Sequence, residues 1–310
     1  MLIKPKKRVI NNCFINNIFN IDCLKLLKKM PDKSVGLIVT SPPYANQRKS
    51  TYGGIEPENY VEWFLPIAKE LLRVLSDEGT FILNIKEKVV NGERHTYVLE
   101  LIVAMKKLGW LWTEEYIWHK KNSFPGKWPN RFRDTFERCF QFNKQRKFYM
   151  DQEAVMVPMG DWKEKRFQCM NKNANRRHSS SVGNSFAKNI SNWENRDMAY
   201  PTNVLSIATE CSNKKHSAAF PIGLPRWFIE LFSRQGDIIL DPFIGSGTTA
   251  AAAIELDRDF IGIEIQEEYA KIACERINRL ELVEHKKKNH TETKKSHLKN
   301  IDATPVIPTI

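Results

Sequence analysis

The sequence lacks several patterns that would assign it to a familiar class of protein. Its six cysteines are scattered and form no Cys-x-x-Cys pair, which argues against both a zinc site and a disulfide framework. They therefore predict free thiols in a reducing cytoplasm. No apolar run approaches the roughly 18 residues that span a bilayer, and no apolar signal core follows the charged start. We expect a cytoplasmic protein without a membrane segment or a metal.

The composition that is present favours a polyanionic partner. The chain has 310 residues, 42% apolar content, a formal net charge of +12 and a pI near 9.3. This length supports one large core or a domain with an insertion. Lys and Arg in excess would neutralise nucleic-acid phosphates, which makes such binding strongly dependent on salt. The charge alone does not identify the partner.

One predicted turn follows a buried strand and carries an unusual set of polar and aromatic groups. The apolar run 35–39 is typical of a strand in a parallel sheet, and it leads into residues 40–44, Thr-Ser-Pro-Pro-Tyr. The two prolines force the chain into a rigid extended turn at the strand's carboxyl end, where open α/β sheets bind ligands. The Ser41 hydroxyl and the Pro42 carbonyl offer two acceptors beside the Tyr44 ring. This set suits a planar base with an exocyclic amino group.

A second turn joins a strand to a helix through glycines. The predicted strand 237–240 ends in the run 241–249, Asp-Pro-Phe-Ile-Gly-Ser-Gly-Thr-Thr. Glycines here let the backbone approach a ligand closely, and helix amides face it. No Lys follows the second glycine, which disfavours a phosphate-binding P-loop. Further on, the strand 260–263 ends at Glu264, whose carboxylate suits two ribose hydroxyls, or else caps the next helix.

Together these motifs resemble those of DNA amino-methyltransferases of bacterial restriction-modification systems. In that family a Ser, Asn or Asp followed by Pro-Pro and an aromatic residue holds the target amino group. The serine form is most similar to the cytosine-N4 subgroup, whereas the aspartate form marks adenine-N6 enzymes. The resemblance covers about 13–143 and 216–280, with the glycine motif last, which is the permuted order of the β group. The Pro-Cys dipeptide of cytosine-carbon methyltransferases is absent from the sequence. The catalytic residues would then be Ser41, Pro42, Pro43 and Tyr44.

The resemblance implies a fold and a cofactor. The expected fold is a three-layer α/β/α Rossmann-like S-adenosylmethionine-dependent methyltransferase fold, with a circularly permuted motif order and an inserted recognition region. Its sheet has seven strands, one antiparallel, and the strands ending at Thr40 and Leu240 must lie side by side. In the family an acidic residue at the position of Asp22 contacts the adenine, although Asp22 would equally serve as a helix cap. The residues expected to bind the cofactor are Asp22, Cys23, Thr40, Ser217, Ala218, Phe220, Asp241, Pro242, Phe243, Gly245, Ser246, Gly247, Thr248, Glu264 and Ile265.

Hydrophobic periodicity places the remaining elements and assigns most aromatic residues to the core. Trp63, in the predicted helix 60–75, is expected in the core. Trp128 and Phe132, in the loop before strand 138–143, are also expected in the core, although each of these two could instead stack on a nucleobase. A lone histidine, His119, is interpreted as structural. The Trp-x-Lys run at 118–120 and the aromatic-Glu pair at 136–137 resemble later motifs of the same family. The other predicted elements are strands at 13–21, 80–85 and 110–118 and helices at 24–30, 97–108, 224–233 and 266–280.

Two basic segments are candidates for DNA contact. The loop 45–54 follows the catalytic turn and suits closure over DNA, with an ordinary surface loop as the alternative. Over 151–213 the periodicity fades and basic residues alternate with aromatic ones, which we interpret as a target-recognition insertion rather than a solvated connector. The expected DNA-binding residues are Arg48, Lys49, Lys163, Arg166, Arg176 and Arg177. The chain would thus comprise a catalytic half (1–150), the insertion (151–213), a cofactor-binding half (214–285) and a disordered basic tail (286–310).

The expected reaction is direct methyl transfer from S-adenosylmethionine to the exocyclic N4 of cytosine in duplex DNA. A stacked base cannot reach the donor, so it must flip out, with Tyr44 stacking on it. Positioning would do most of the work. The alternatives are an adenine-N6 enzyme, an RNA or protein methyltransferase with a similar turn, and a non-catalytic DNA-binding regulator. The expected partners are double-stranded DNA and, acting separately, a cognate restriction endonuclease.

Overall fold

The computed structural model describes residues 14–46, 53–123, 126, 128–159, 197–210, 220–280 and 282. The chain divides into two compact units, residues 1–150 with 204–310 and residues 151–203. Within the described part, no helix is long and apolar enough to cross a membrane, and no cluster of His, Cys, Asp and Glu side chains could hold a metal ion. Cys23, Cys139 and Cys274 are free thiols there.

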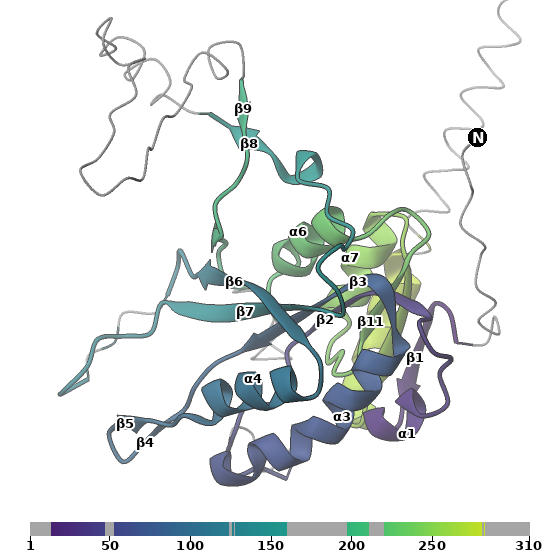
Figure 1. Ribbon diagram of the computed structural model, residues 1–310. Helices are drawn as coiled ribbons and strands as arrows, with labels where there is room; N and C mark the ends of the chain where they lie inside the picture. The colour runs from purple at the N-terminus through teal and green to yellow at the C-terminus, as the bar shows by residue number, and fades with distance from the viewer. Residues whose placement is uncertain are drawn as a thin grey trace, which may run out of the picture. The chain divides into compact units, whose positions relative to one another are not determined.

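The larger unit is built on a mixed sheet of eight strands in the order β1-β12-β11-β2-β3-β7-β6-β10 (Figure 1). Neighbouring strands are parallel, except that β7 runs antiparallel to both β3 and β6. A separate antiparallel hairpin, β4 (Val89–Val90) with β5 (Glu93–Arg94), follows β3. The sheet strands are β1 (Asn17–Asn20), β2 (Val35–Thr40), β3 (Leu75–Ile85), β6 (Leu111–His119), β7 (Phe136–Asn143), β10 (Val204–Ser206), β11 (Ile238–Asp241) and β12 (Asp259–Glu264).

Helices cover both faces of this sheet, which confirms the predicted three-layer fold. Figure 1 shows α1, α3 and α4 on one face and α6 and α7 on the other. Arg276, in a helix over residues 267–280, donates to Thr248 Oγ1 of α7 at 3.0 Å, so this helix lies beside α7. The helices are α1 (Cys23–Leu27), the short 3-10 helix η1 (Pro57–Asn59), α3 (Tyr60–Val74), α4 (Tyr97–Lys107), α6 (Gly223–Phe232) and α7 (Thr248–Glu255).

The core lies between the helices and the sheet. In α3 the buried residues recur every three or four positions, which places Tyr60, Phe64, Leu71 and Val74 on one face. They pack with strand residues such as Phe81 into one continuous cluster. Burial of each such side chain contributes roughly 1.5–3 kcal/mol. This packing holds the strands whose ends form the site.

The central pair of strands brings together two distant parts of the sequence. In β11 and β2, Ile239 pairs with Leu37 and Leu240 with Ile38, which confirms that these two strands lie side by side. Here the strand order reverses, since β12 and β1 lie beyond β11 whereas β3 lies beyond β2. Such a switch point leaves a crevice at the carboxyl ends of the strands.

The sheet differs from the seven strands expected, because β10 adds an eighth at the β6 edge. Ile207 N donates to His119 O at 3.1 Å, and the indole Nε1 of Trp118 donates to Ile207 O at 2.9 Å. A buried indole N–H needs an acceptor, and the segment that follows β10 supplies it. Residues 204–210 therefore belong to the larger unit, whereas the insertion proposed from the sequence extends to residue 213.

Two element boundaries also differ from prediction. β3 starts at Leu75, directly after α3, whereas the sequence predicted a strand only over 80–85. Gly79 lets the first part of β3 lie close to β2, because a Cβ at this position would stand only 2.8 Å from the carbonyl oxygen of Gly36. β1 starts only at Asn17, because Asn16 has a left-handed φ of 57° that no strand accommodates.

The smaller unit is described only at its two ends. Asp151 Oδ1 accepts the backbone amides of Glu153 and Ala154 at 3.1 and 3.2 Å, which begins the 3-10 turn η2 (Glu153–Val155). β8 (Val157–Pro158) then pairs antiparallel with β9 (Met198–Ala199). The two described ends of this segment are thus joined as neighbouring strands. Residues 160–196, which carry Lys163, Arg166, Arg176 and Arg177, lie outside the described residues.

Candidate active site

A cavity of about 620 Å³ lies where the carboxyl ends of β2 and β11 meet. The turn after β2 lines it with Ser41, Pro42, Pro43 and Tyr44. The turn after β11 lines the same cavity with residues 242–246. The two sequence motifs, about 200 residues apart, therefore face one space, as their strand positions require.

Asp241 ties the two turns together from behind the cavity wall. Its Oδ1 accepts the Thr40 hydroxyl at 2.6 Å and the Phe243 amide at 3.1 Å, and its Oδ2 accepts the Thr249 hydroxyl at 2.6 Å. Burial raises the pKa of this carboxyl to about 6, although the three hydrogen bonds lower it. Asp241 and Thr40 are buried and do not line the cavity. The geometry gives them a positioning role.

The glycine turn leads into α7 and presents backbone groups to Glu264. Gly247 has a φ of +81°, and a Cβ there would lie 3.1 Å from the Cβ of Ala273, so glycine is needed for both conformation and packing. The Gly245 amide donates to Glu264 Oε2 at 3.0 Å, and the Gln266 amide to Oε1 at 2.9 Å. These bonds fix the buried Glu264 carboxylate at the cavity wall.

Two further cavity residues, Asp22 and Cys23, lie at the start of α1. Asp22 precedes α1, and its side chain accepts the Lys25 amide at 3.0 Å, so it caps the helix while it also lines the cavity. Next to it, burial raises the pKa of the Cys23 thiol to about 12, with the Asp22 charge adding to the effect. Cys23 therefore faces the cavity as an uncharged thiol and not as a nucleophile.

The other end of the cavity is lined by side chains from three neighbouring strands. Asn84 and Lys86 come from the end of β3, Trp118 and Lys120 from the end of β6, and Glu137 from the start of β7. Residues two apart on a strand share a face, and Trp118 pairs directly with Glu137 across the sheet. Because β7 is antiparallel, its beginning lies at the same edge as the ends of β3 and β6.

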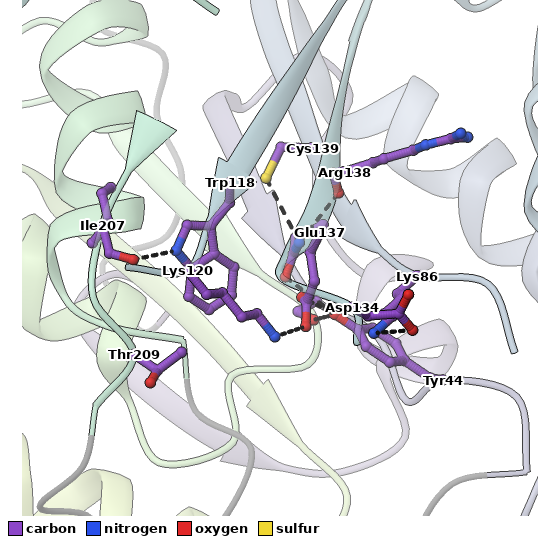
Figure 2. Close-up of polar contacts among 12 residues, drawn as sticks. Tyr44, Lys86, Trp118, Lys120, Asp134, Glu137, Arg138, Cys139, Ile207 and Thr209 are labelled. Atoms are coloured by element: carbon purple, nitrogen blue, oxygen red, sulfur yellow. Dashed lines mark hydrogen bonds and ion pairs between the residues drawn. The ribbon is translucent and has the colours of Figure 1, made fainter. Parts of the chain in front are cut away.

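Glu137 connects the turn after β2 to this group (Figure 2). Tyr44 Oη donates to Glu137 Oε2 at 2.7 Å, and Lys120 Nζ donates to Glu137 Oε1 at 2.6 Å. Ser41 Oγ donates to Tyr44 Oη at 3.2 Å. A residue of α3 also holds the turn in place, since Tyr60 Oη donates to the Pro43 carbonyl at 2.9 Å. The arrangement holds a serine hydroxyl and an aromatic ring in place at the cavity.

Comparison with known proteins decides what this arrangement is. A family model for N6 and N4 enzymes, described as DNA methylase, matches residues 35–275, which is most of the chain and includes both turns. The chain belongs to this family. It is a DNA methyltransferase, and the predicted family and fold are confirmed.

Individual relatives agree with the assignment to the DNA methylases. The chain is 30% identical over 280 residues to the Type II methyltransferase M.PvuII of Proteus hauseri, covering 83% of this chain and 82% of that protein. It is 28% identical over 296 residues to the Type II methyltransferase M.Cfr9I of Citrobacter freundii, covering 84% and 87%.

Solved structures show the same fold. The PvuII DNA methyltransferase, described as cytosine-N4-specific, matches with a TM-score of 0.63 at 25% identity, over 85% of this chain and 90% of that chain. An M1.HpyAVI–SAM complex matches with a TM-score of 0.51 at 20% identity, over 84% of this chain and 98% of that chain. The second likeness concerns the fold alone.

The methylase cavity fits the methyl donor expected from the sequence. Ser246 Oγ is buried at its wall and has no hydrogen-bond partner among the described residues, so a polar ligand group would satisfy it. The rings of Phe243 and Trp63 lie 5.8 Å apart and form an apolar wall. With the fixed carboxylate of Glu264, these residues offer what a molecule with an apolar middle and polar ends requires.

The structure places the predicted site residues in three groups. Those that line the cavity are Asp22, Cys23, Ser41, Pro42, Pro43, Tyr44, Phe220, Pro242, Phe243, Gly245, Ser246, Thr248, Glu264 and Ile265. Those that lie behind the wall are Thr40, Asp241 and Gly247. Those that lie outside the described residues are Arg48, Lys49, Ser217, Ala218 and the four basic residues of the insertion.

Three aromatic residues expected in the core are not fully buried. Trp63 of α3 is half-buried, packs against the core cluster and against Phe243, and lines the cavity. Trp128 is 52% exposed and Phe132 is 95% exposed, in the loop between β6 and β7. The Arg131 guanidinium lies 4.5 Å from the Trp128 ring centroid. The core assignment of Trp128 and Phe132 was wrong, whereas Trp63 packs against the core cluster and lines the cavity as well.

Sequence reasoning missed the roles of Lys120 and Glu137, although a signal was present. The Trp-x-Lys run and the aromatic-Glu pair resemble motifs of the family, but the resemblance assigns neither residue a role. In a strand, Trp118 and Lys120 point to one face and His119 to the other, and His119 is exposed and does not line the cavity.

Proposed function

We propose that this DNA methyltransferase transfers a methyl group from S-adenosylmethionine to the exocyclic N4 of cytosine at a specific site in duplex DNA. The observation that carries the proposal is the shared cavity, in which the serine form of the amino-holding turn and the glycine turn lie side by side. The 30% identity to M.PvuII and the structural likeness to a cytosine-N4-specific enzyme support the choice of base.

The donor end of the cavity would be formed by the glycine turn and its neighbours. Glu264 and Asp22 would accept hydrogen bonds from the sugar and base of the donor, and Ser246 would bond a polar group of its amino-acid part. Phe243 and Trp63 would shield the apolar middle from water. When bound, S-adenosylmethionine supplies an activated methyl group on a positively charged sulfur.

The acceptor end would hold a base turned out of the duplex. Ser41 Oγ and the Pro42 carbonyl would accept the two amino hydrogens, which draws electron density onto the nitrogen. Tyr44 would stack on the base, and its hydroxyl bond to Glu137 fixes the ring before the base arrives. Holding the nitrogen in line with the methyl group removes most of the entropic barrier.

The proposed partners follow from the reaction. Double-stranded DNA is the substrate, and the basic residues of the insertion and of the loop after Tyr44 would contact it. M.PvuII and M.Cfr9I are named Type II methyltransferases, so we infer a restriction-modification role with a separately acting endonuclease. The enzyme would act in the cytoplasm, on nucleoid DNA.

The deciding experiment identifies the methylated base. Purified protein is incubated with isotopically labelled S-adenosylmethionine and unmodified bacteriophage genomic DNA, which offers many short sequences, and the DNA is digested to nucleosides for mass spectrometry. We expect labelled N4-methylcytosine. Labelled N6-methyladenine would assign the adenine reaction instead, since both amino groups suit the same acceptors.

Parallel reactions with RNA and with polypeptides test the acceptor class. Transfer to either one in preference to DNA would contradict the proposal. Absence of transfer to all three, with cofactor binding retained in titration calorimetry, would favour a non-catalytic DNA-binding regulator. Modified-base sequencing of DNA from cells that express the protein would then identify the recognition site.

A further inference from the structure

A continuous chain of hydrogen bonds runs from the catalytic serine to a buried ion pair. Ser41 Oγ donates to Tyr44 Oη at 3.2 Å, Tyr44 Oη donates to Glu137 Oε2 at 2.7 Å, and Lys120 Nζ donates to Glu137 Oε1 at 2.6 Å. Figure 2 shows Glu137 between the tyrosine hydroxyl and the lysine ammonium. The chain therefore leads from the catalytic serine to a largely buried carboxylate at the other end of the cavity.

The direction of each bond follows from the chemistry of the groups. An ionised carboxylate only accepts, and an ammonium only donates, so Glu137 is the acceptor at both ends. Burial and the nearby Glu137 charge raise the pKa of the Tyr44 hydroxyl well above its ordinary value, so it keeps its proton and donates it. The Ser41 hydroxyl then directs its hydrogen to Tyr44, and its lone pairs remain for a ligand.

Glu137 is the acceptor that the geometry favours over its neighbour. Asn84 Oδ1 also lies near Tyr44 Oη, but at 3.3 Å, and it is a neutral amide. The carboxylate is closer and charged, which makes the stronger hydrogen bond. Lys120 balances its charge, and the Trp118 ring, 4.9 Å from the ammonium, holds the lysine in place.

We propose that Ser41, Tyr44 and Glu137 form a relay that removes the proton lost by the target nitrogen, and that Lys120 positions the carboxylate that receives it. The relay rests on the proposed function, because it begins at an amino group held by Ser41. It adds a destination for the proton, which the two cavity acceptors alone do not provide.

The relay balances atoms and charge. The methyl carbon leaves the donor sulfur, which keeps the electron pair of the broken bond, and bonds to the nitrogen through the nitrogen lone pair. The nitrogen, now positive, gives one proton to Ser41 Oγ, while the Ser41 proton passes to Tyr44 Oη and the Tyr44 proton to Glu137 Oε2. Both hydroxyls end neutral, and Glu137 ends as a neutral carboxyl beside the Lys120 ammonium. It releases the proton to solvent after the product leaves.

The test removes single relay atoms and keeps the shapes of the side chains. Tyr44→Phe keeps the stacking ring and removes the hydroxyl, and Glu137→Gln keeps the side-chain volume and removes the charge. Single-turnover methyl transfer is measured on unmodified bacteriophage DNA with saturating S-adenosylmethionine. We expect each variant to lower the rate constant by about 10²-fold, within the range of general acid–base effects. The double variant should be no slower than the slower single variant, because either change already breaks the relay.

Tyr116→Phe is the matched control. Tyr116 of β6 is a buried tyrosine whose hydroxyl likewise donates to a side chain, Gln141 Oε1 at 3.1 Å, but it does not line the cavity. We expect its rate constant to stay within about twofold of wild type. Cofactor affinity, measured by calorimetry, should be unchanged in all variants.

A measurement without donor or DNA tests the hydrogen bond directly. In protein labelled with carbon-13 at tyrosine Cζ, the Tyr44 resonance is the one that disappears in Tyr44→Phe. It should shift in Glu137→Gln, because a neutral amide replaces the charged acceptor, and stay in place in Tyr116→Phe. A Tyr44 resonance that does not respond to Glu137→Gln would overturn the relay.

The kinetic outcomes separate the relay from the proposed function. Active wild-type protein with an unaffected Tyr44→Phe, or with single effects that add in the double variant, would overturn the relay alone. Wild-type protein that transfers no methyl group to DNA would overturn the proposed function and the relay with it.

Discussion

At the scale of single residues, the site depends on side chains that hold other side chains. Tyr44 is bonded to Glu137, Glu137 to Lys120, and the catalytic turn to Tyr60. Only Tyr44 belongs to the recognisable turn. The others lie on or next to neighbouring strands and helices, where burying a polar group without a partner costs free energy. Their loss is therefore expected to affect stability as well as catalysis.

The Lys120–Glu137 pair offers a prediction about stability. The two side chains are 19% and 10% exposed, so Lys120→Met leaves a poorly solvated carboxylate without its cation. We expect the free energy of unfolding to fall by roughly 1–3 kcal/mol in urea denaturation. Adding Glu137→Gln should restore part of the loss, because no charge then remains buried.

The control for this prediction is an exposed ion pair. Lys271 and Glu267 are each 69% exposed, and Lys271→Met should give no measurable change in stability. A Lys120→Met protein as stable as wild type, or a double variant no more stable than the single one, would contradict the role given to the pair.

At the scale of elements, the site requires β2 and β11 to be neighbours. The backbone pairing of Leu240 with Ile38 sets their register, and Asp241 then binds Thr40 at the end of β2 and Thr249 in α7. One buried carboxyl thus joins two strands and a helix at the edge of the cavity. Because it is buried, its ionisation opposes folding, and its hydrogen bonds compensate for this only in part.

The raised pKa of Asp241 therefore predicts how the stability of the protein depends on pH. Its folded-state pKa of about 6 lies above its ordinary value of 3.8. Between these pH values the unfolded chain has lost the proton while the folded protein keeps it, so stability from this group falls as pH rises. Over the complete titration, from well below pH 3.8 to well above pH 6, the loss is about 3 kcal/mol.

Asp241→Asn removes this titration and isolates it from other groups. The stability of the variant relative to wild type should rise by about 2 kcal/mol between pH 4 and pH 7, measured by urea denaturation at several pH values. A difference that stays constant with pH, or that shrinks as pH rises, would contradict the buried carboxyl as its source.

At the scale of the whole molecule, charge and cavity serve different ligands. The chain carries a net charge of +12, whereas the donor end of the cavity is bounded by the carboxylates of Asp22 and Glu264. Exposed basic residues suit DNA phosphates, and the enclosed acidic and apolar wall suits the methyl donor. Salt should therefore affect the two ligands unequally.

This inequality is measurable with one protein preparation. Raising salt from 50 to 200 mM should weaken DNA binding, followed by fluorescence anisotropy, by about tenfold or more, because released counterions drive the association. The affinity for S-adenosylmethionine, measured by calorimetry over the same range, should change by less than about twofold. Equal salt dependence of both ligands would refute the assignment of the surface charge to DNA.

Much of the fold could be predicted from the sequence, because its signals are local. Apolar runs mark the strands, helical spacing marks α3 and α4, and proline and glycine restrict the backbone at the two turns. The prediction that β2 and β11 are neighbouring strands is also confirmed, and it followed from the order of the two motifs. The eighth strand was not predicted, because β10 has only three residues and no pattern of its own.

The sequence by itself determined the residues and backbone restrictions of the turns at Ser41 to Tyr44 and at 241–249, since each depends on residues close together in the chain. It also determined the family and the three-layer fold, which follow from the two motifs and their order. Only the tertiary structure decided that Trp63 lines the cavity, that Trp128 and Phe132 are exposed, and that Glu137 meets Tyr44 and Lys120. The reason is that these contacts depend on which strands are neighbours and on the reversed direction of β7, neither of which is encoded by spacing along the chain.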